Sequence, residues 1–366
     1  MSDRIGGYIR PGYDPIQVPN PPTLNSASNT GEAAFTAPSE VGGGAITSYI
    51  ALATNTSTGA VTTVTGASSP LAFSGLTIGT SYAFTVVAVN AFGPSAVSNT
   101  ITVTIAAVQG QQAYTTEGSF SWVAPSGVTS ISIVAIGGAG GSKSSGGGGG
   151  GAALGYKNNL TVSPGTSYTV VVGNDGNDEQ TGEASYITVG STNYGANGGL
   201  RSVSNTGGAG GTPLSGSSGG SGGAGGTGAR GGGGGAGGYS GNGGAGGGRD
   251  GVYTGSNGSG GGAGGGYAGS QDGGGGGGTG LLGEGSSGAG ATTYTTPNAY
   301  TYGAGGGGGS GGGDGKGAGG ATPNGDGAYG GGAGSGSNKG TNAHGAIRII
   351  WPGTTRQFPS TNTGDV

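Results

Sequence analysis

The stretch GGGGGAGGYSGNGGAGGG, residues 231–248, represents the region that decides what this chain can fold into. The sequence has 104 glycines, of which 15 precede Gly137 and two follow Gly345. Average usage is about 7%, and such runs bring no side chains that could form an ordinary core. Each glycine also loses more conformational freedom on ordering than any other residue. Two outcomes are therefore open for residues 207–342: a disordered linker, or close packing of bare backbones.

The packed outcome would be a bundle of polyproline-II-type helices made of glycine. Such a helix has three residues per turn and no internal hydrogen bonds, so its N–H and C=O groups must pair with neighbouring helices or with water. Glycine allows this because only a missing side chain lets backbones approach closely. Collagen is excluded, because the strict Gly-X-Y period is absent and the chain has only 15 prolines.

A repeated spacing of 14 residues favours the bundle. Tyr239, Tyr253, Tyr267 and Leu281 follow one another at this spacing, and each has glycine two positions later. About 11 or 12 extended residues would span roughly 35 Å and leave two or three for a reversal. We therefore predict packed glycine rods with these residues at the reversals. Successive reversals should alternate, so that Tyr239 and Tyr267 share one end and Tyr253 and Leu281 the other.

Composition narrows the function. Charged residues make up 7% of the chain, with 11 basic and 15 acidic residues and a formal net charge of −4. The basic residues are scattered and form no patch that would indicate nucleic acid. There is no cysteine, and no apolar run approaches the 18 or more residues of a membrane span, so we expect no membrane insertion. The start has no apolar signal region, which favours assembly in a cytoplasm.

Residues 1–20 are predicted to be an extended arm, because prolines and glycines are frequent there. Tyr8, Ile9 and Tyr13 are its candidate attachment residues, and a frayed terminus is the alternative. Residues 21–105 change to short alternating apolar runs with turns about every ten residues, which predicts an antiparallel β-sandwich. The expected strands lie at 33–35, 49–53, 61–64, 82–89 and 100–103.

The 21–105 segment resembles a fibronectin type III domain. The similarity is carried by AFTAP at 34–38, ITSY at 46–49, GLTIGTSY at 75–82 and VAVNAFGPS at 87–95. Leu76 and Tyr82 match the Leu…Tyr corner of that family, while Phe35 stands where the core tryptophan is usual. The resemblance implies a spacer module without chemistry of its own.

A second β framework is predicted over 113–206 and 343–352, after a linker at 106–112. Strands are expected at 119–123, 130–136, 152–162, 167–172 and 186–189, and the last one at 346–351, beyond the glycine tract. Glycine rods bury little apolar surface, so a framework that holds both ends of the tract would support their order. Residues 353–366 are predicted to be a tail. The expected fold class is mostly β with a large glycine-rich insertion.

The framework and its insertion resemble glycine-rich virion structural proteins of T4-like phages of marine cyanobacteria. The similarity is carried by FSWVAPSGV at 120–128, GGAGG at 137–141, GAIRIIWPG at 345–353 and FPST at 358–361. The tract is also similar to the polyglycine-rod sandwiches of tail-fibre tip adhesins, whose turn loops bind the host surface. These resemblances imply a fibre or decoration protein of the virion, with other virion proteins as partners of the arm and host-surface glycans as partners of the outer module.

Candidate surface-binding residues lie in the predicted turns: Tyr239, Tyr253, Tyr267, Leu281, Leu282, Arg249 and Asp250. Aromatic faces suit stacking on sugars, and the alternative for the tyrosines is that they plug the turns. The loop from Asn174 to Glu179 gathers oxygen ligands that suit calcium, but it lacks the spacing of a known calcium loop. A solvated loop is the alternative there.

No catalytic set is visible, and we expect neither enzyme activity nor a cofactor. The nucleophile-elbow pattern around Ser221 is expected by chance in such a glycine-rich tract and lacks the strand-to-helix context. His344 is the only histidine and is expected beside the last strand. A bacterial surface adhesin and an ice-binding protein are the alternative functions. The adhesin would need a secretion signal or wall anchor, and the ice-binding protein a flat, regular face of small residues. The oligomeric state stays open.

Overall fold

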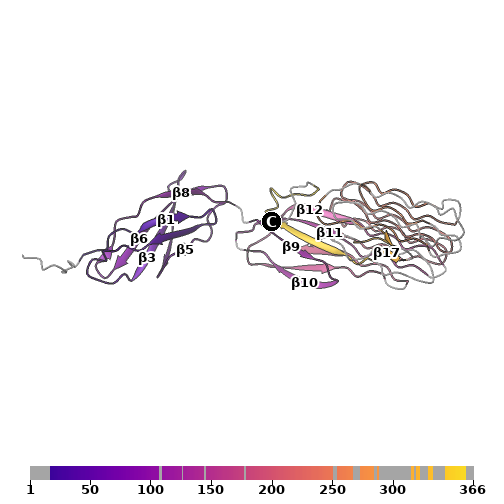
Figure 1. The fold of residues 1–366 in the computed structure, drawn as a ribbon, viewed down its shortest axis with the longest axis horizontal. Helices are drawn as coiled ribbons and strands as arrows, with labels where there is room; N and C mark the ends of the chain where they lie inside the picture. Colours follow the sequence, from indigo (N-terminus) through magenta and orange to yellow (C-terminus); the bar gives the residue numbers. More distant parts are fainter. Residues whose placement is uncertain are drawn as a thin grey trace, which may run out of the picture. The chain divides into compact units, whose positions relative to one another are not determined.

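The computed structural model describes residues 17–106, 109–125, 127–143, 146–176, 179–249, 254–266, 273–283, 287, 315–316, 319–321, 329–332 and 343–359. The chain divides into two compact units, Met1–Val108 and Gln109–Val366. Both are built from antiparallel strands (Figure 1), and the described residues include no helix. The chain is therefore mostly β, as predicted.

The first unit has two antiparallel sheets. One has the strand order β1-β2-β5, and the other β4-β3-β6-β7, with β8 also paired to β6. Each of the five runs predicted as strands overlaps an observed one. The bounds are β1 (Thr23–Ala27), β2 (Glu32–Thr36), β3 (Ser48–Asn55), β4 (Val61–Gly66), β5 (Leu71–Ala72), β6 (Ser81–Asn90), β7 (Gly93–Pro94) and β8 (Ile101–Thr104).

The alternation of apolar residues in β3 and β6 turns every second side chain toward one core that both sheets share. The ring of Phe35 from β2 lies 4.6 Å from that of Tyr49 from β3, centroid to centroid. Tyr82 is 5% exposed, and its hydroxyl accepts a hydrogen bond from the backbone N–H of Thr77 at 3.2 Å. Tyr82 is therefore buried in this core, next to the turn that contains Thr77.

The predicted arm is shorter than expected at its inner end. Tyr8, Ile9 and Tyr13 lie outside the described residues. The N–H of Gln17 donates to the carbonyl of Gly42 at 3.0 Å, and the N–H of Asn20 donates to that of Glu40 at 3.0 Å. Residues 17–20 therefore belong to the first unit, because their backbone groups pair with its turn at 40–42.

The second unit contains two four-stranded sheets with the orders β12-β11-β18-β9 and β10-β13-β14-β15. Apolar side chains from both sheets form a common core that includes Ile133, Val170 and Ile347. A further pair, β16-β17, lies apart from them. The bounds are β9 (Gly110–Tyr114), β10 (Gly118–Val123), β11 (Ser130–Ile136), β12 (Leu154–Thr161), β13 (Ser167–Val172), β14 (Ser185–Val189), β15 (Thr192–Ala196), β16 (Gly315–Lys316), β17 (Gly319–Ala321) and β18 (Ala346–Trp351).

Strand β18 lies inside its sheet although it comes last in the chain. It pairs antiparallel with β11 and with β9, and Ile349 stands opposite both Ile133 and Gln112. All six residues of β18 are buried. The glycine tract thus begins after β15 of one sheet and ends at β18 of the other, so the two sheets of this unit hold its two ends.

Two predicted boundaries of the second unit are wrong. Strand β9 begins at Gly110, inside the stretch 106–112 that was predicted as a linker. Residues 353–359 are not a free tail, because Phe358 is 2% exposed and its backbone is hydrogen-bonded to the side chain of Asn158. In both places the pairing partner is distant in sequence, so local patterns did not reveal it.

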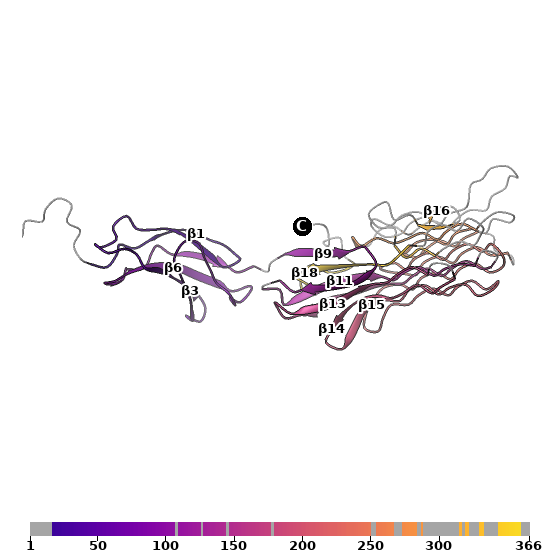
Figure 2. The same ribbon diagram turned by 90° about the horizontal axis from the view of Figure 1, so that it is seen from below.

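The glycine-rich part forms extended segments that run side by side from the sheets (Figures 1 and 2) and are not strands of a ladder. Every residue of segment 231–238 is buried. Its N–H groups donate to three neighbouring segments, and residues three positions apart donate to the same segment. Gly233 and Ala236 donate to Gly274 and Gly277, Gly234 and Gly237 to Gly149 and Ala152, and Gly232 and Gly235 to Gly247 and Gly244.

The carbonyl groups of segment 231–238 follow the same period. Gly232 and Gly235 accept from Gly226 and Gly223, Gly233 and Ala236 accept from Gly265 and Gly262, and Gly234 accepts from Gly332. Six different stretches of the chain therefore surround this segment among the described residues. Because successive residues turn to different neighbours, the backbone polar groups are satisfied without a sheet.

This contact leaves no space for side chains at the glycine positions. A Cβ on Gly234 would lie 2.0 Å from the carbonyl oxygen of Gly223, and a Cβ on Gly276 would lie 2.1 Å from that of Gly234. Similar segments occur at 146–151 and 197–203. The predicted start of the glycine module at 207 is therefore late.

The predicted alternation of the four bulky residues is wrong. Tyr239 and Leu281 lie in the same apolar cluster beside β11, β12 and β18, so they share one end of the segments. The reason is segment length, because stretches such as 241–248, 255–259 and 261–266 are shorter than the 11 or 12 residues assumed. The chain therefore crosses the module an even number of times between Tyr239 and Leu281 and returns to the same end. Tyr253 and Tyr267 lie outside the described residues.

Candidate functional site

Tyr239 is a structural residue of the second unit and not a ligand-facing one. It is 2% exposed, its hydroxyl donates to the carbonyl of Gly280 at 3.1 Å, and it accepts from the N–H of Gly283 at 3.2 Å. Burial raises the pKa of the Tyr239 hydroxyl, while the Gly283 N–H and the charge of Arg348 lower it in part. The tyrosine plugs a turn, which was the alternative to a sugar-stacking role.

Leu281 and Arg348 complete this anchor. Leu281 is 7% exposed, so it offers no surface to a ligand either. The buried guanidinium of Arg348 donates through Nη1 to the carbonyl of Leu281 at 3.2 Å, and through Nε to the side chain of Gln111 at 2.9 Å. The charged side chain of Arg348 in β18 is thus hydrogen-bonded to a reversal of the glycine segments and fixes its position. Arg348 was not recognised from the sequence, because nothing local distinguishes it from an exposed arginine.

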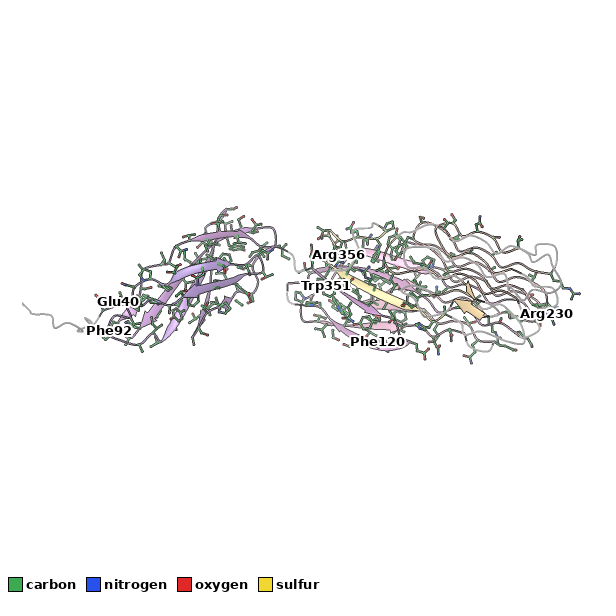
Figure 3. The ribbon with its side chains drawn as sticks, in the orientation of Figure 1. Glu40, Phe92, Phe120, Arg230, Trp351 and Arg356 are labelled. Atoms are coloured by element: carbon green, nitrogen blue, oxygen red, sulfur yellow. The ribbon has the colours of Figure 1, made fainter. Side chains whose placement is uncertain are left out.

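The other candidate residues are distributed over both ends. Leu282 is 37% exposed beside the anchor, while Asp250 lies outside the described residues. Arg249 is exposed, and its N–H donates to the carbonyl of Thr227 at 2.8 Å. Arg230, in the turn after Thr227, lies at the end of the segments remote from Trp351 and Arg356 (Figure 3).

The remote end carries basic side chains. Arg230 has a φ of 70°, and its N–H donates to the carbonyl of Gly146 at 3.0 Å, one turn away from Lys143. Lys143 and Glu179 are 4.0 Å apart and their side chains are about half exposed, so their ion pair contributes little to stability.

The segments at the outside of the module form a layer with one exposed face. Five stretches lie next to one another in the order 197–203, 206–212, 219–227, 242–248 and 256–259. The links between them include Leu200 N–H to Ala209 O, Gly225 N–H to Gly208 O, Gly246 N–H to Ala224 O and Ser256 N–H to Ala245 O. Segments 148–153, 231–238 and 261–265 cover the inner side of this layer.

Every third residue of the layer points outward. We call these residues the uncharged face, since none of them carries a charge: Asn197, Leu200, Val203, Thr206, Ala209, Thr212, Ser221, Ala224, Thr227, Asn242, Ala245, Ser256 and Ser259. Asn197 and Ser221 are half-buried and the others are exposed. The glycines between them meet neighbouring backbones, as at Gly222 and Gly225. The Gly-Gly-X spacing of 219–227 was the sequence signal for this face.

The face is ordered in two directions. Along a segment its side chains repeat every three residues, or about 9 Å. Across the layer the separation is about 4.8 Å, as backbone hydrogen bonds impose on adjacent extended chains. The Oδ1 of Asn242 accepts from the N–H of Ser221 at 2.9 Å, and the Nδ2 of Asn197 donates to the hydroxyl of Thr212 at 3.3 Å. These bonds hold side chains in place across the columns.

The loop predicted as a calcium site is only partly described, because Asn177 and Asp178 lie outside the described residues. Gly176 and Gln180 pack against Gly141, so the loop lies along the glycine segments. Among the described residues, no group of three or more His, Asp or Glu side chains is arranged to hold a metal ion. Calcium binding stays a prediction.

The other motifs considered in the sequence analysis lie at positions that give no sign of catalysis. Ser221 lies in an extended segment and not at a strand-to-helix turn. His344 precedes β18, and its ring lies 5.8 Å from that of Tyr329. The described residues contain no helix with the length and apolar character needed to cross a membrane. Comparison with models of known protein families finds no match, and neither does comparison with curated proteins.

Proposed function

We propose that the extended segments of the second unit are polyglycine-II-type helices. The three-residue period of the hydrogen bonds around 231–238 supports this assignment, since such helices have three residues per turn and bond only to neighbours. We also propose that the first unit is a fibronectin type III-like spacer. The two sheets with a shared core, and the Tyr82 hydroxyl bound to the N–H of Thr77, support that part.

We further propose that the chain is a non-enzymatic structural protein of a phage virion, a fibre or decoration protein. The arm attaches it, the first unit spaces it, and the glycine module is presented outward, where it contacts host-surface glycans. The observation that carries this proposal is the anchored glycine module. Its segments expose an ordered surface, β15 and β18 lie at the two ends of the tract, and the Tyr239 cluster anchors one of its reversals.

The test of this function is incorporation into phage particles. Deletion of residues 2–16 leaves the hydrogen bonds of Gln17 and Asn20 with the first unit intact, so the variant should fold. We expect particles that lack the protein, whereas the full chain should be detected on purified particles by a C-terminal label. Normal incorporation of the deletion variant would refute attachment through the arm. Absence of the full chain from particles would refute the virion assignment and favour a cell-surface adhesin.

A further inference from the structure

We propose that the uncharged face binds the flat surface of a packed, neutral polysaccharide. This inference rests on the proposed function as far as host contact is concerned, but it assigns the contact to a different surface from the turns. The turns near the sheets are occupied by buried Tyr239 and Leu281. The uncharged face is the extended surface that the layer leaves open.

The chemistry of the face favours sugar chains over a charged ligand. Its middle row contains Leu200, Ala209, Ala224, Ala245 and Ser256, and the first four form an apolar strip. The rows on either side consist mainly of hydroxyl and amide side chains: Thr212, Ser221 and Asn242 lie on one side, and Thr206 and Thr227 lie on the other, together with the apolar Val203. A neutral sugar chain has the complementary arrangement, with apolar ring faces flanked by hydroxyl groups. Arg201, beside the face, directs its guanidinium to the carbonyl of Glu179 at 3.2 Å.

The rigidity of the face suits an ordered partner. Backbone hydrogen bonds fix the position of each column, and Ala, Ser and Thr lose little rotamer freedom when they are covered. Binding to a surface with its own regular spacing therefore costs little ordering entropy on the protein side. A single flexible sugar would use only a small part of this array.

A second copy of the chain fits less well. Three rows about 9 Å apart and five columns about 4.8 Å apart, counted at their full widths, cover roughly 650 Å². A stable protein–protein interface buries about 800 Å² on each partner. The face is therefore suited to a weak contact that is repeated by many copies on one particle, as avidity requires.

The test uses the full chain and microcrystalline cellulose as a neutral, packed polysaccharide. Ala224→Lys places a charge in the middle row, at an exposed position where a Cβ already exists, so folding should be preserved. Thr166→Lys, in the exposed turn before β13, is the matched control. We expect the unaltered chain and the control to co-sediment with the particles. We expect Ala224→Lys to bind at least about tenfold less, as an unpaired charge against a neutral surface should.

Folding of each variant is checked by thermal unfolding, and Ala245→Lys is the second variant if Ala224→Lys is destabilised.

Binding should persist in about 0.5 M salt, where screening removes contacts between exposed charges. Failure of the unaltered chain to sediment, or binding by a folded face variant equal to that of the unaltered chain, would overturn the proposal. Binding only to dextran sulfate at low salt would overturn it in favour of the basic turns at Arg230 and Arg249. Shaping of ice crystals without cellulose binding would overturn it in favour of an ice-binding face. Incorporation into phage particles is measured in a separate experiment, so the virion proposal and the polysaccharide proposal can each fail without the other.

Discussion

The ring of Tyr239 stacks on that of Phe358, with ring centroids 5.8 Å apart and planes inclined by 23°. One residue lies at a reversal of the glycine segments and the other follows the last strand. Their contact belongs to a cluster that also includes Ile136, Leu154 and Ile350 from three strands. The glycine module, which has little apolar surface of its own, is thus attached to a conventional core at one end.

The hydroxyl of Tyr239 should contribute to stability. Tyr239→Phe keeps the ring contacts but leaves the carbonyl of Gly280 and the N–H of Gly283 without their hydroxyl partner in a buried site. We expect the free energy of unfolding to fall by about 1–3 kcal/mol. Urea denaturation followed by tyrosine fluorescence measures this, with the half-buried Tyr194 changed to Phe as control. Equal midpoints for the unaltered chain and Tyr239→Phe would contradict the assignment.

The same residue should make stability depend on pH in alkaline solution. Burial raises the pKa of Tyr239 above its ordinary value of 10.0, so the folded state holds this proton more tightly than the unfolded chain does. The stabilising contribution is complete below about pH 10 and is lost as pH rises beyond it. The stability difference between the unaltered chain and Tyr239→Phe should therefore shrink above pH 10. If the unfolding free energies of the two proteins ran parallel from pH 7 to 11, this prediction would be wrong. Burial also raises the pKa of Tyr114, but both proteins contain Tyr114, so it affects both curves alike.

A side chain inside the glycine module should not be tolerated. In Gly234→Val the new Cβ would meet the carbonyl oxygen of Gly223, which is held by hydrogen bonds and cannot move independently. We expect a loss of about 3 kcal/mol or more, or failure of the second unit to fold. Ser240→Val is the control, because Ser240 is exposed at a reversal. Thermal unfolding monitored by circular dichroism compares them, and similar midpoints would show that the segments are not closely packed.

The corner of the first unit should depend on one hydroxyl. Tyr82→Phe removes the acceptor for the N–H of Thr77, and we expect about 1 kcal/mol of destabilisation. Tyr49→Phe, in the same core, should have a smaller effect because its ring contact with Phe35 remains. Residues 17–106 expressed alone allow the measurement by chemical denaturation. A helical or coil-like circular dichroism spectrum of this fragment would refute the fold of the unit.

The sequence by itself determined most of the longer strands, but not β1, β9 or β15, and it limited the glycine tract to a disordered linker or backbones packed without side chains. Alternating apolar residues placed β3, β6, β11 and β18 within a residue or two of their bounds, because the side-chain period of a strand is a local property. Only the tertiary structure decided that Tyr239 and Leu281 share one end, that Arg348 holds the reversal, and that 197–259 expose an uncharged face. The physical reason is that bare glycine backbones have no side chains to specify where a segment reverses or which neighbours it meets. Those choices depend on hydrogen bonds between residues distant in the chain, so segment lengths and facing sides appear only when the segments are assembled.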